Sequence, residues 1–295
     1  MNIGKTARQS QFHRSQIGRA QRYIRMHLDE AFSIAQLARE AGSSPFHFAR
    51  LFQAFVGETP FEFIRRIRLM TALQMLREDA EASVTEIALC IGYETPAAFN
   101  KALRKAIRMT PSDFRKAGQA KQDALIQALS EPKRLKEVYL QMTTEYDAIH
   151  RDLTHYVFLE QHGPFAEIAP PLWGDLMPML PPLRSLICEF LGLSGVDPAE
   201  SGEKTMIYQA GVALSEKPAE LPAKMQYRAV PAGRYARFLL TGPYTQIWSA
   251  FDQIFKTLAE RGVALRPECC IENYLNDPQN TPEKDLKTEL LVPIA

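Results

Sequence analysis

Apolar residues recur at helical spacing in two stretches of the chain that match each other. The apolar positions fall three and four residues apart, which is the period of one helix face. They are Ile34, Leu37, Ala38 and Ala41 in the first stretch and Val84, Ile87, Ala88 and Ile91 in the second. After one inserted residue in the turn, further matches continue as far as Phe63 and Phe114. We therefore predict one supersecondary unit that is used twice.

Each copy carries residues that begin and end helices at the same places. A serine can cap the first helix, a glycine can end it, and a proline fits the first turn of the next helix. These residues are Ser33, Gly42 and Pro45 in the first copy and Ser83, Gly92 and Pro96 in the second. A short helix, a glycine-containing turn and a second helix form a helix-turn-helix unit. We place the two units at 33–55 and 83–106.

The polar and apolar pattern also predicts the segments around these units. An apolar stripe with arginines largely off it predicts one long linking helix at 61–78. Residues Tyr23–Leu28 are expected in an opening helix, and the polar stretch Met1–Gln16 in a short flexible arm. The Ala- and Gln-rich segment 118–136 has the composition of a linker that is helical in part.

The second half of the chain changes to the alternating or β-branched pattern of strands. The expected strands are His155–Glu160, Thr205–Leu214, Tyr235–Thr241, Cys269–Tyr274 and Lys287–Pro293, and the expected helices are Ile168–Leu180 and Gln246–Arg261. A Gly-Pro pair stands between strand and helix twice, at Gly163 and at Gly242, which predicts two similar halves with a cleft between them. The expected fold class is α + α/β with two domains: an all-α tandem helix-turn-helix domain, then an α+β domain of two pseudo-symmetric βαββ halves.

Charge is distributed unevenly, although the net charge is only +1. Residues 1–117 carry 18 Lys and Arg against 11 Asp and Glu, whereas residues 137–295 carry 13 against 21. A basic half suits a polyanion and an acidic half repels one, so we expect the halves to have different partners. There is no apolar run of 18 residues, no secretory signal and no C-x-x-C pair among the four cysteines. We therefore expect a cytoplasmic protein with reduced thiols and no membrane contact.

The first domain, placed at 12–117, resembles the DNA-binding domain of the AraC/XylS family of regulators. The matching residues are Leu37-Ala38, Ala41–Phe48, Arg50–Phe52, Gly57–Pro60, Arg65, Arg68, Ile87-Ala88, Gly92-Tyr93, Phe99 and Thr110-Pro111. One departure is Arg108, which stands where the family usually has glycine before the Thr-Pro pair. If that turn requires a positive φ angle, arginine strains it by about 1 kcal/mol.

The resemblance implies that the second helix of each unit enters one of two successive major-groove segments of double-stranded DNA. The residues expected to face the DNA are Phe46, Ala49, Arg50 and Gln53 in the first unit and Pro96, Ala97, Asn100, Lys101, Arg104 and Lys105 in the second. Arg50 suits guanine because its planar fork matches the O6 and N7 acceptors, and Asn100 suits adenine. Phosphate anchors are expected at Lys105, Arg115 and Lys116. His47 is expected to be structural.

The second domain, 137–295, resembles GyrI-like effector-binding domains. The resemblance rests on Pro231–Tyr235, Gly242–Tyr244, Glu272–Pro278, Thr281–Glu283 and Thr288–Pro293. In such domains a strand carboxylate lies in an aromatic-lined cleft that meets cationic or amphiphilic ligands, and the matching residue here is Glu272. Strand alternation places Tyr274 on the same side. The candidate aromatic walls are Phe165, Trp173, Tyr208, Tyr244 and Trp248.

Together the two resemblances imply a sequence-specific transcription regulator that is not an enzyme and needs no cofactor or metal. Its expected partners are double-stranded DNA, a small-molecule effector and RNA polymerase. Two alternatives remain for the second domain: a small-molecule hydrolase with Glu272 as general base, or a protein-docking module with a filled pocket. No pattern in the sequence indicates how effector binding and DNA binding would be coupled.

Overall fold

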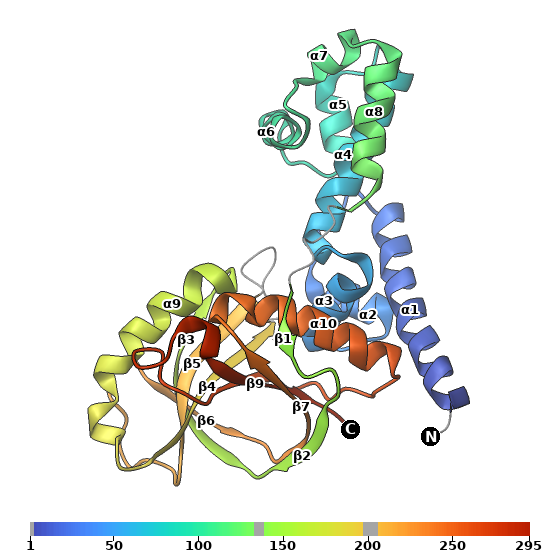
Figure 1. The fold of residues 1–295 in the computed structure, drawn as a ribbon. Helices are drawn as coiled ribbons and strands as arrows, with labels where there is room; N and C mark the ends of the chain where they lie inside the picture. The colour runs from blue at the N-terminus through green and yellow to red at the C-terminus, as the bar shows by residue number, and fades with distance from the viewer. Residues whose placement is uncertain (1–2, 133–138, 197–205) are drawn as a thin grey trace.

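The computed structural model describes residues 3–132, 139–196 and 206–295 (side chains from residue 11 onward, Phe46 excepted). A helical lobe and a larger lobe built on one sheet meet where α3 (Pro45–Val56) lies against α10 (Ile247–Glu260) (Figure 1). This arrangement confirms the expected fold class. None of the helices in the described ranges combines the length and apolar character needed to cross a membrane.

Helices packed around a central linking helix, α4 (Pro60–Glu78), make up the first lobe. Besides α3 and α4 they are α1 (Ile3–Met26), α2 (Ile34–Ala41), α5 (Val84–Cys90), α6 (Pro96–Ile107), α7 (Pro111–Lys116) and α8 (Gln119–Ser130). The Ser33 hydroxyl accepts a hydrogen bond from the first turn of α2, and Ser83 forms a reciprocal capping box with Glu86. Gly42 ends α2 in the left-handed conformation, with φ of 66°. Both helix-turn-helix units therefore form where the sequence predicts them.

The long helix α4 contributes to the cores of both units. Its first half adds Phe63 and Ile67 to the apolar cluster of the first unit. Its second half adds Leu73 and Leu76 to the cluster of the second unit. The two units therefore hold α3 and α6 on a shared helix, as the linking helix predicted from the sequence requires.

The expected flexible arm at Met1–Gln16 is wrong, because α1 begins at Ile3 and continues through the whole segment. Gln16 and Ile17 are buried, and the Gln16 amide donates a hydrogen bond to the Gly42 carbonyl. The Gln16 side chain thus caps the turn of the first unit instead of facing solvent, and this contact cannot be seen in a hydrophobic pattern.

The expected linker 118–136 is mostly the helix α8, which packs along α4. Leu125 and Leu129 pack against the second apolar cluster, and the buried Gln122 amide donates a hydrogen bond of 2.9 Å to the Phe114 carbonyl. This part of the segment therefore belongs to the first lobe and is not a free spacer. Residues 133–136 of the expected linker lie outside the described residues.

The second lobe is an antiparallel sheet covered on one side by α9 (Phe165–Leu176) and α10 (Figure 1). Its strands are β1 (Gln141–Met142), β2 (Asp147–Arg151), β3 (Thr154–His162), β4 (Ile187–Val196), β5 (Met206–Leu214), β6 (Gln226–Val230), β7 (Gly233–Thr241), β8 (Cys270–Tyr274) and β9 (Lys287–Pro293). The strand order is β1-β7-β9-β8-β4-β5-β3-β6, and β2 also pairs with β7.

The sheet contains the two predicted βαββ halves, β3-α9-β4-β5 and β7-α10-β8-β9. β4 and β8 pair at the centre, and the strand order outward from this pair is the same in both halves. Before each helix a glycine adopts a positive φ angle, 140° at Gly163 and 139° at Gly242, which other residues rarely adopt. The short strand before each half crosses to the other half, since β2 pairs with β7 and β6 pairs with β3.

The sequence pattern missed β4, which is the central strand of the first half. Its sequence contains Gly192 and Gly195, and its register shifts between Ile187 and Glu189. A central strand is covered on both faces, so it shows no clean alternation of polar and apolar residues. The short edge strands β1, β2 and β6 were missed as well.

The two lobes share a continuous apolar core. Phe251 and Phe255 on α10 belong to the same cluster of buried residues as Phe48 and Phe52 of the first unit. All four side chains are fully buried. One face of α10 therefore covers its own sheet while another covers α3 and α1.

Candidate effector pocket and DNA-binding helices

The structure brings all the expected pocket residues of the second domain together around one cavity of about 700 Å³. They are Phe165, Trp173, Tyr208, Tyr244, Trp248, Glu272 and Tyr274. The cavity lies between the two βαββ halves, since its walls come from α9, α10 and the central strands. Its volume is within the range of about 300–1,000 Å³ that is usual for small-molecule sites.

Glu272 forms the polar floor of this cavity and is 1% exposed. Its Oε2 accepts hydrogen bonds from the hydroxyls of Tyr274 at 2.7 Å and Tyr208 at 3.2 Å. The Trp173 indole in turn donates to the Tyr208 hydroxyl at 3.1 Å. The other oxygen, Oε1, is buried and has no hydrogen-bond partner within the described part of the chain. This oxygen of the carboxylate therefore has unused hydrogen-bond acceptor capacity.

Burial raises the pKa of Glu272 to about 7, although the hydrogen bonds from Tyr274 and Tyr208 and the charge of Arg50 oppose this shift. A bound cation would favour the ionised carboxylate and lower this pKa. Glu272 and Asp277 are the charged groups among the described residues that line the cavity, and both are acidic. The cavity is therefore electrostatically suited to a cation.

Aromatic rings form the walls of the cavity. Phe165 and Trp248 stack face to face with their centroids 4.0 Å apart, and Tyr274 forms T-shaped contacts with Trp173 and Tyr244. Such rings provide apolar area and negative faces that attract cations. The sequence did not single out Asp277 or the apolar residues Met177, Phe190 and Leu275, which also line the cavity. Leu275 and Asp277 do fall within the segment Glu272–Pro278 that carries the family resemblance.

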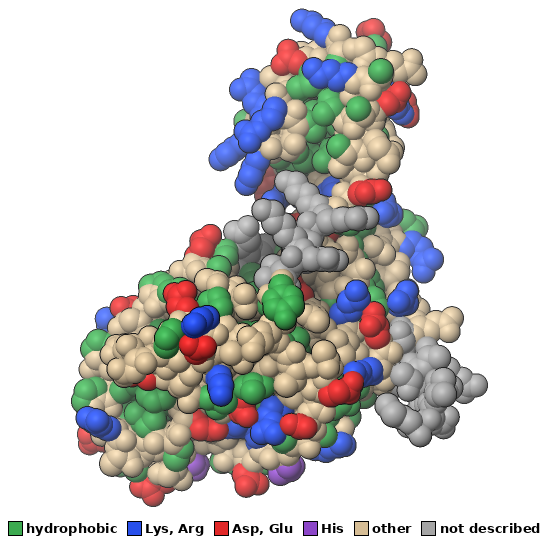
Figure 2. Space-filling view, viewed as in Figure 1, with side chains coloured by type: hydrophobic (Ala, Val, Ile, Leu, Met, Phe, Trp, Pro, Cys, Tyr) green, Lys and Arg blue, Asp and Glu red, His purple; other side chains and the backbone are tan. Residues whose placement is uncertain are grey.

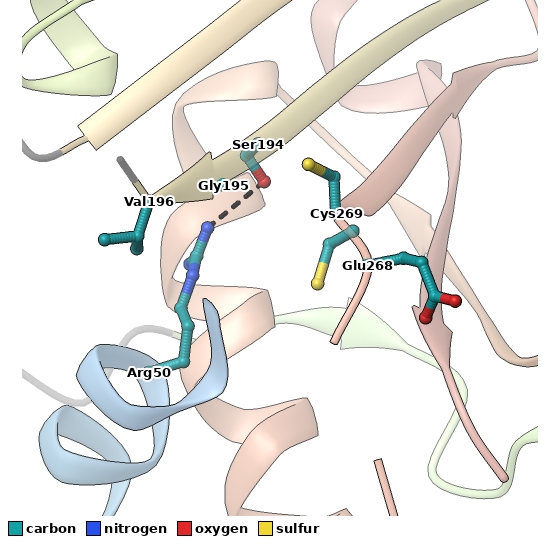
Figure 3. Close-up of a pocket in the computed structure, with 7 residues that line it drawn as sticks. Arg50, Ser194, Gly195, Val196, Glu268 and Cys269 are labelled. Carbon is teal, nitrogen blue, oxygen red and sulfur yellow. Dashed lines mark hydrogen bonds between the residues drawn. The ribbon is translucent and has the colours of Figure 1, made fainter. Parts of the chain in front are cut away.

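The base-facing side of the first recognition helix, α3, does not face solvent in this structure. The guanidinium of Arg50 reaches β4 and donates a hydrogen bond of 3.2 Å to the Ser194 hydroxyl (Figure 3). The Gln53 amide donates to the Asp252 carboxylate on α10 at 2.8 Å. The expectation that these residues are open to DNA therefore needs correction, because the second domain covers them.

The neighbouring positions of α3 are also involved in this contact. His47 is 4% exposed, and its Nε2 forms a hydrogen bond with the Arg266 carbonyl, so its expected structural role is that of a contact between the domains. Ala49 is half-buried and packs against the shared core. The side chain of Phe46, the remaining base-facing candidate of this unit, lies outside the described residues.

The second recognition helix, α6, is open. Ala97, Lys101, Arg104 and Lys105 are exposed, and Pro96 and Asn100 are half-buried. Lys and Arg side chains project from the edge of the helical lobe where α6 lies (Figure 2). This edge therefore presents the concentrated positive charge that a DNA backbone requires.

Two basic residues near α6 differ in their availability. The Arg115 guanidinium donates hydrogen bonds to the carbonyls of Asp79 at 3.1 Å and of Ala82, in the connection between α4 and α5. Nε and Nη2 of Arg115 therefore already bond to backbone carbonyls, and its expected role as a phosphate anchor stays a prediction. Lys116 is exposed, as its expected role requires. Arg108 is also exposed, and its φ angle of 59° confirms the strained turn.

Comparison with known proteins agrees with this division of the chain. A model of a helix-turn-helix domain matches residues 37–117, and a model of the GyrI-like small molecule binding domain matches residues 144–295. Among solved structures, the EcmrR C-terminal domain is 17% identical, with a TM-score of 0.41, and the match covers 54% of this chain and 99% of that one.

Two curated relatives are regulators. The probable transcription factor PqrA of Proteus vulgaris is 34% identical over 90 residues, which are 30% of this chain and 73% of the relative. The regulatory protein SoxS of Salmonella typhimurium is 32% identical over 93 residues, which are 32% of this chain and 86% of the relative. The chain thus belongs to the AraC family of transcription regulators, and it joins an AraC-type helix-turn-helix DNA-binding domain to a GyrI-like small-molecule-binding domain.

Proposed function

We propose that this regulator senses an organic cation or cationic amphiphile in the cavity around Glu272 and contacts double-stranded DNA through α3 and α6. The observation that carries the ligand class is the buried carboxylate with an unpartnered oxygen at the floor of an aromatic, acidic cavity. An unpaired buried carboxylate is costly, and a ligand cation would offset that cost. The rings around it would add about 0.5–2 kcal/mol for each well-placed cation–π contact.

The test of the ligand class uses tetraphenylphosphonium, which has a permanent charge and aromatic faces, with neutral triphenylphosphine oxide as its matched control. The chain has two tryptophans, Trp173 and Trp248, and both line the cavity, so their fluorescence reports binding directly. We expect saturable quenching by the cation and at least ten-fold weaker binding of the neutral compound, since each 1.4 kcal/mol is about ten-fold.

A matched pair of variants separates the buried carboxylate from general surface charge. Glu272→Gln keeps the shape and removes the charge, so it should lose the preference for the cation. Glu283→Gln removes an exposed carboxylate from the same domain and should behave as wild type. Equal affinity of wild type and Glu272→Gln for the cation would refute the proposed role of the carboxylate.

The DNA-binding part of the proposal concerns the base-facing residues of α3 and α6. Exposed cations on α6 can reach the backbone and the groove, and α3 would contact the adjacent groove segment once its base-facing side is free. Contact with RNA polymerase and a cytoplasmic location, both expected of such a regulator, complete the proposal. The hydrolase alternative is not favoured, because the matching relatives are transcription regulators.

A further inference from the structure

The residues of α3 that suit base pairs are the same residues that hold α3 on the second domain. Arg50 bonds to Ser194, and Gln53 bonds to Asp252. A guanidinium that occupies this site cannot at the same time reach a guanine edge in the major groove. DNA binding by α3 and docking of α3 are therefore mutually exclusive.

The site that receives Arg50 is a cage of aromatic rings. The guanidinium carbon lies 5.0 Å from the ring centroid of Phe251, 5.1 Å from Trp248, 5.4 Å from Phe165 and 5.9 Å from Phe255. Cation–π contacts with partly desolvated rings contribute up to about 2 kcal/mol each. The cage therefore holds α3 firmly in the docked position.

The cage of Arg50 and the effector cavity are adjacent and share two rings. Phe165 and Trp248 contact Arg50 and also line the cavity. The strands β4 and β8 serve both sites as well. Ser194 on β4 binds Arg50 and lies opposite Cys270 on β8 in the sheet. Glu272, at the cavity floor, is two residues further along β8. A two-residue step along a strand is about 7 Å.

Besides the two shared rings, an electrostatic interaction couples the Arg50 cage to the effector cavity. The charge of Arg50 favours the ionised form of Glu272, so Arg50 supplies part of the positive potential that this carboxylate needs. A cation in the cavity would supply the same potential from the other side and would repel Arg50. Coupling between two binding events is reciprocal. A ligand that weakens the docking of α3 when it binds at Glu272 therefore binds more tightly when α3 is undocked.

We infer that docking of α3 on α10 keeps the regulator from engaging DNA with both recognition helices, and that a cation bound at Glu272 releases α3. The docking is an autoinhibitory contact, and its release gives positive coupling between effector and DNA. The second half of this inference rests on the proposed ligand class, whereas the first half does not.

The docking is tested without any ligand by Asp252→Arg in the full chain. Arginine at this place on α10 removes the acceptor of Gln53 and repels Arg50, and position 252 is not among the proposed DNA-binding residues. The matched control is Asp175→Arg, which adds the same charge at an exposed position on α9. The DNA is a duplex selected by the wild-type chain from a random library of about 20 base pairs, enough for two groove segments.

We expect Asp252→Arg to bind this duplex about ten-fold more tightly than Asp175→Arg, because the binding-competent fraction rises. Equal affinities of the two variants would overturn the docking inference. Since position 252 is half-buried, circular dichroism first establishes that the variant folds, and Asp252→Ala serves as the milder replacement if it does not.

The release is tested with tetraphenylphosphonium and the wild-type chain. Where tryptophan fluorescence shows that the cation binds, DNA affinity should rise by about ten-fold, and Asp252→Arg should respond much less. Bound cation with unchanged or weaker DNA affinity would overturn the coupling. Absence of cation binding would refute the proposed ligand class and the release of α3 by a cation. The comparison of Asp252→Arg with Asp175→Arg would still test whether docking of α3 inhibits DNA binding.

Movement of the two domains relative to each other can be followed in the wild-type chain through labels on its own cysteines. Cys90 and Cys188 are exposed and lie in different domains, while burial raises the pKa of Cys269 and raises that of Cys270 to about 12. Thiol labels at neutral pH should therefore react first with Cys90 and Cys188. We expect energy transfer between them to change on addition of the cation, and an unchanged distance would count against release.

Discussion

The hydroxyl of Tyr274 donates a hydrogen bond of 2.7 Å to Oε2 of Glu272, which lies two residues earlier on the same strand. Alternation along β8 places both side chains on the cavity side. The phenol therefore stabilises one oxygen of the carboxylate and leaves the other without a protein partner in the described part of the chain. This arrangement governs how the carboxylate responds to pH and to ligands.

The first prediction concerns stability. Burial raises the pKa of Glu272 from 4.5 to about 7, so its contribution to stability is present below about pH 4.5 and is lost as pH rises through 7. Glu272→Gln has no such loss. Between pH 4.5 and pH 8, the free energy of unfolding of the variant should rise by about 3 kcal/mol relative to that of wild type. Urea denaturation at each pH measures this difference. A difference that stays constant with pH would show that Glu272 is not buried as described.

The second prediction concerns ligand binding and pH. A permanently charged cation prefers the ionised carboxylate, and ionisation of Glu272 increases from pH 6 to pH 8. The affinity for tetraphenylphosphonium should therefore rise about ten-fold over this range. Fluorescence titration of the two tryptophans measures it, and Glu272→Gln should remove the dependence. A pH-independent affinity of wild type would be incompatible with binding at Glu272.

The third prediction concerns Gly192 on β4, which pairs with Glu272. A Cβ atom at this position would overlap the Tyr208 hydroxyl and would lie 3.0 Å from Oε2 of Glu272. Gly192→Ala should displace the hydrogen-bonded cluster and weaken cation binding by about ten-fold or more. Gly174→Ala is the control, since a Cβ atom there meets nothing within 4 Å. Equal affinities of the two variants would show that the cluster does not hold the ligand.

The fourth prediction concerns the turn after α6. Arg108 has φ of 59°, while Gly57 at the same place in the first unit has φ of 84°. Arg108→Gly should stabilise the protein by about 1 kcal/mol, because glycine adopts positive φ without steric cost. Gly57→Ala is the reverse control and should destabilise it through the backbone, since a Cβ atom at Gly57 meets nothing within 4 Å. Urea denaturation measures both, and a destabilised Arg108→Gly would contradict the strain.

The fifth prediction distinguishes residues of α6 that recognise bases from residues of α6 that contact phosphates. Asn100→Ala should cost about 1–3 kcal/mol on the selected duplex and relax preference at one base pair. Lys105→Ala should weaken binding to all duplexes alike and reduce the salt dependence, because it removes a phosphate contact. Binding titrations at several salt concentrations distinguish the two. An equal loss for Asn100→Ala on random DNA would refute base reading by this residue.

Local chemistry determined most of what the sequence predicts correctly. Serine caps, glycine ends and helical apolar spacing act within a few residues of one another, so both helix-turn-helix units could be placed from the pattern. The repeated Gly-Pro turn likewise predicted the two βαββ halves. Strand alternation then put Glu272 and Tyr274 together, and family resemblance supplied the remaining walls of the cavity.

Tertiary structure decided what the recognition helix α3 faces. Arg50 and Ser194 are 144 residues apart, and Gln53 and Asp252 are 199 apart, so no local pattern relates them. The sequence alone does not distinguish these partners, because a guanidinium can either hydrogen-bond to guanine or stack on aromatic rings. The choice depends on the apolar face of α10, which buries Phe251 and Phe255 against α3 and so fixes which partner Arg50 meets.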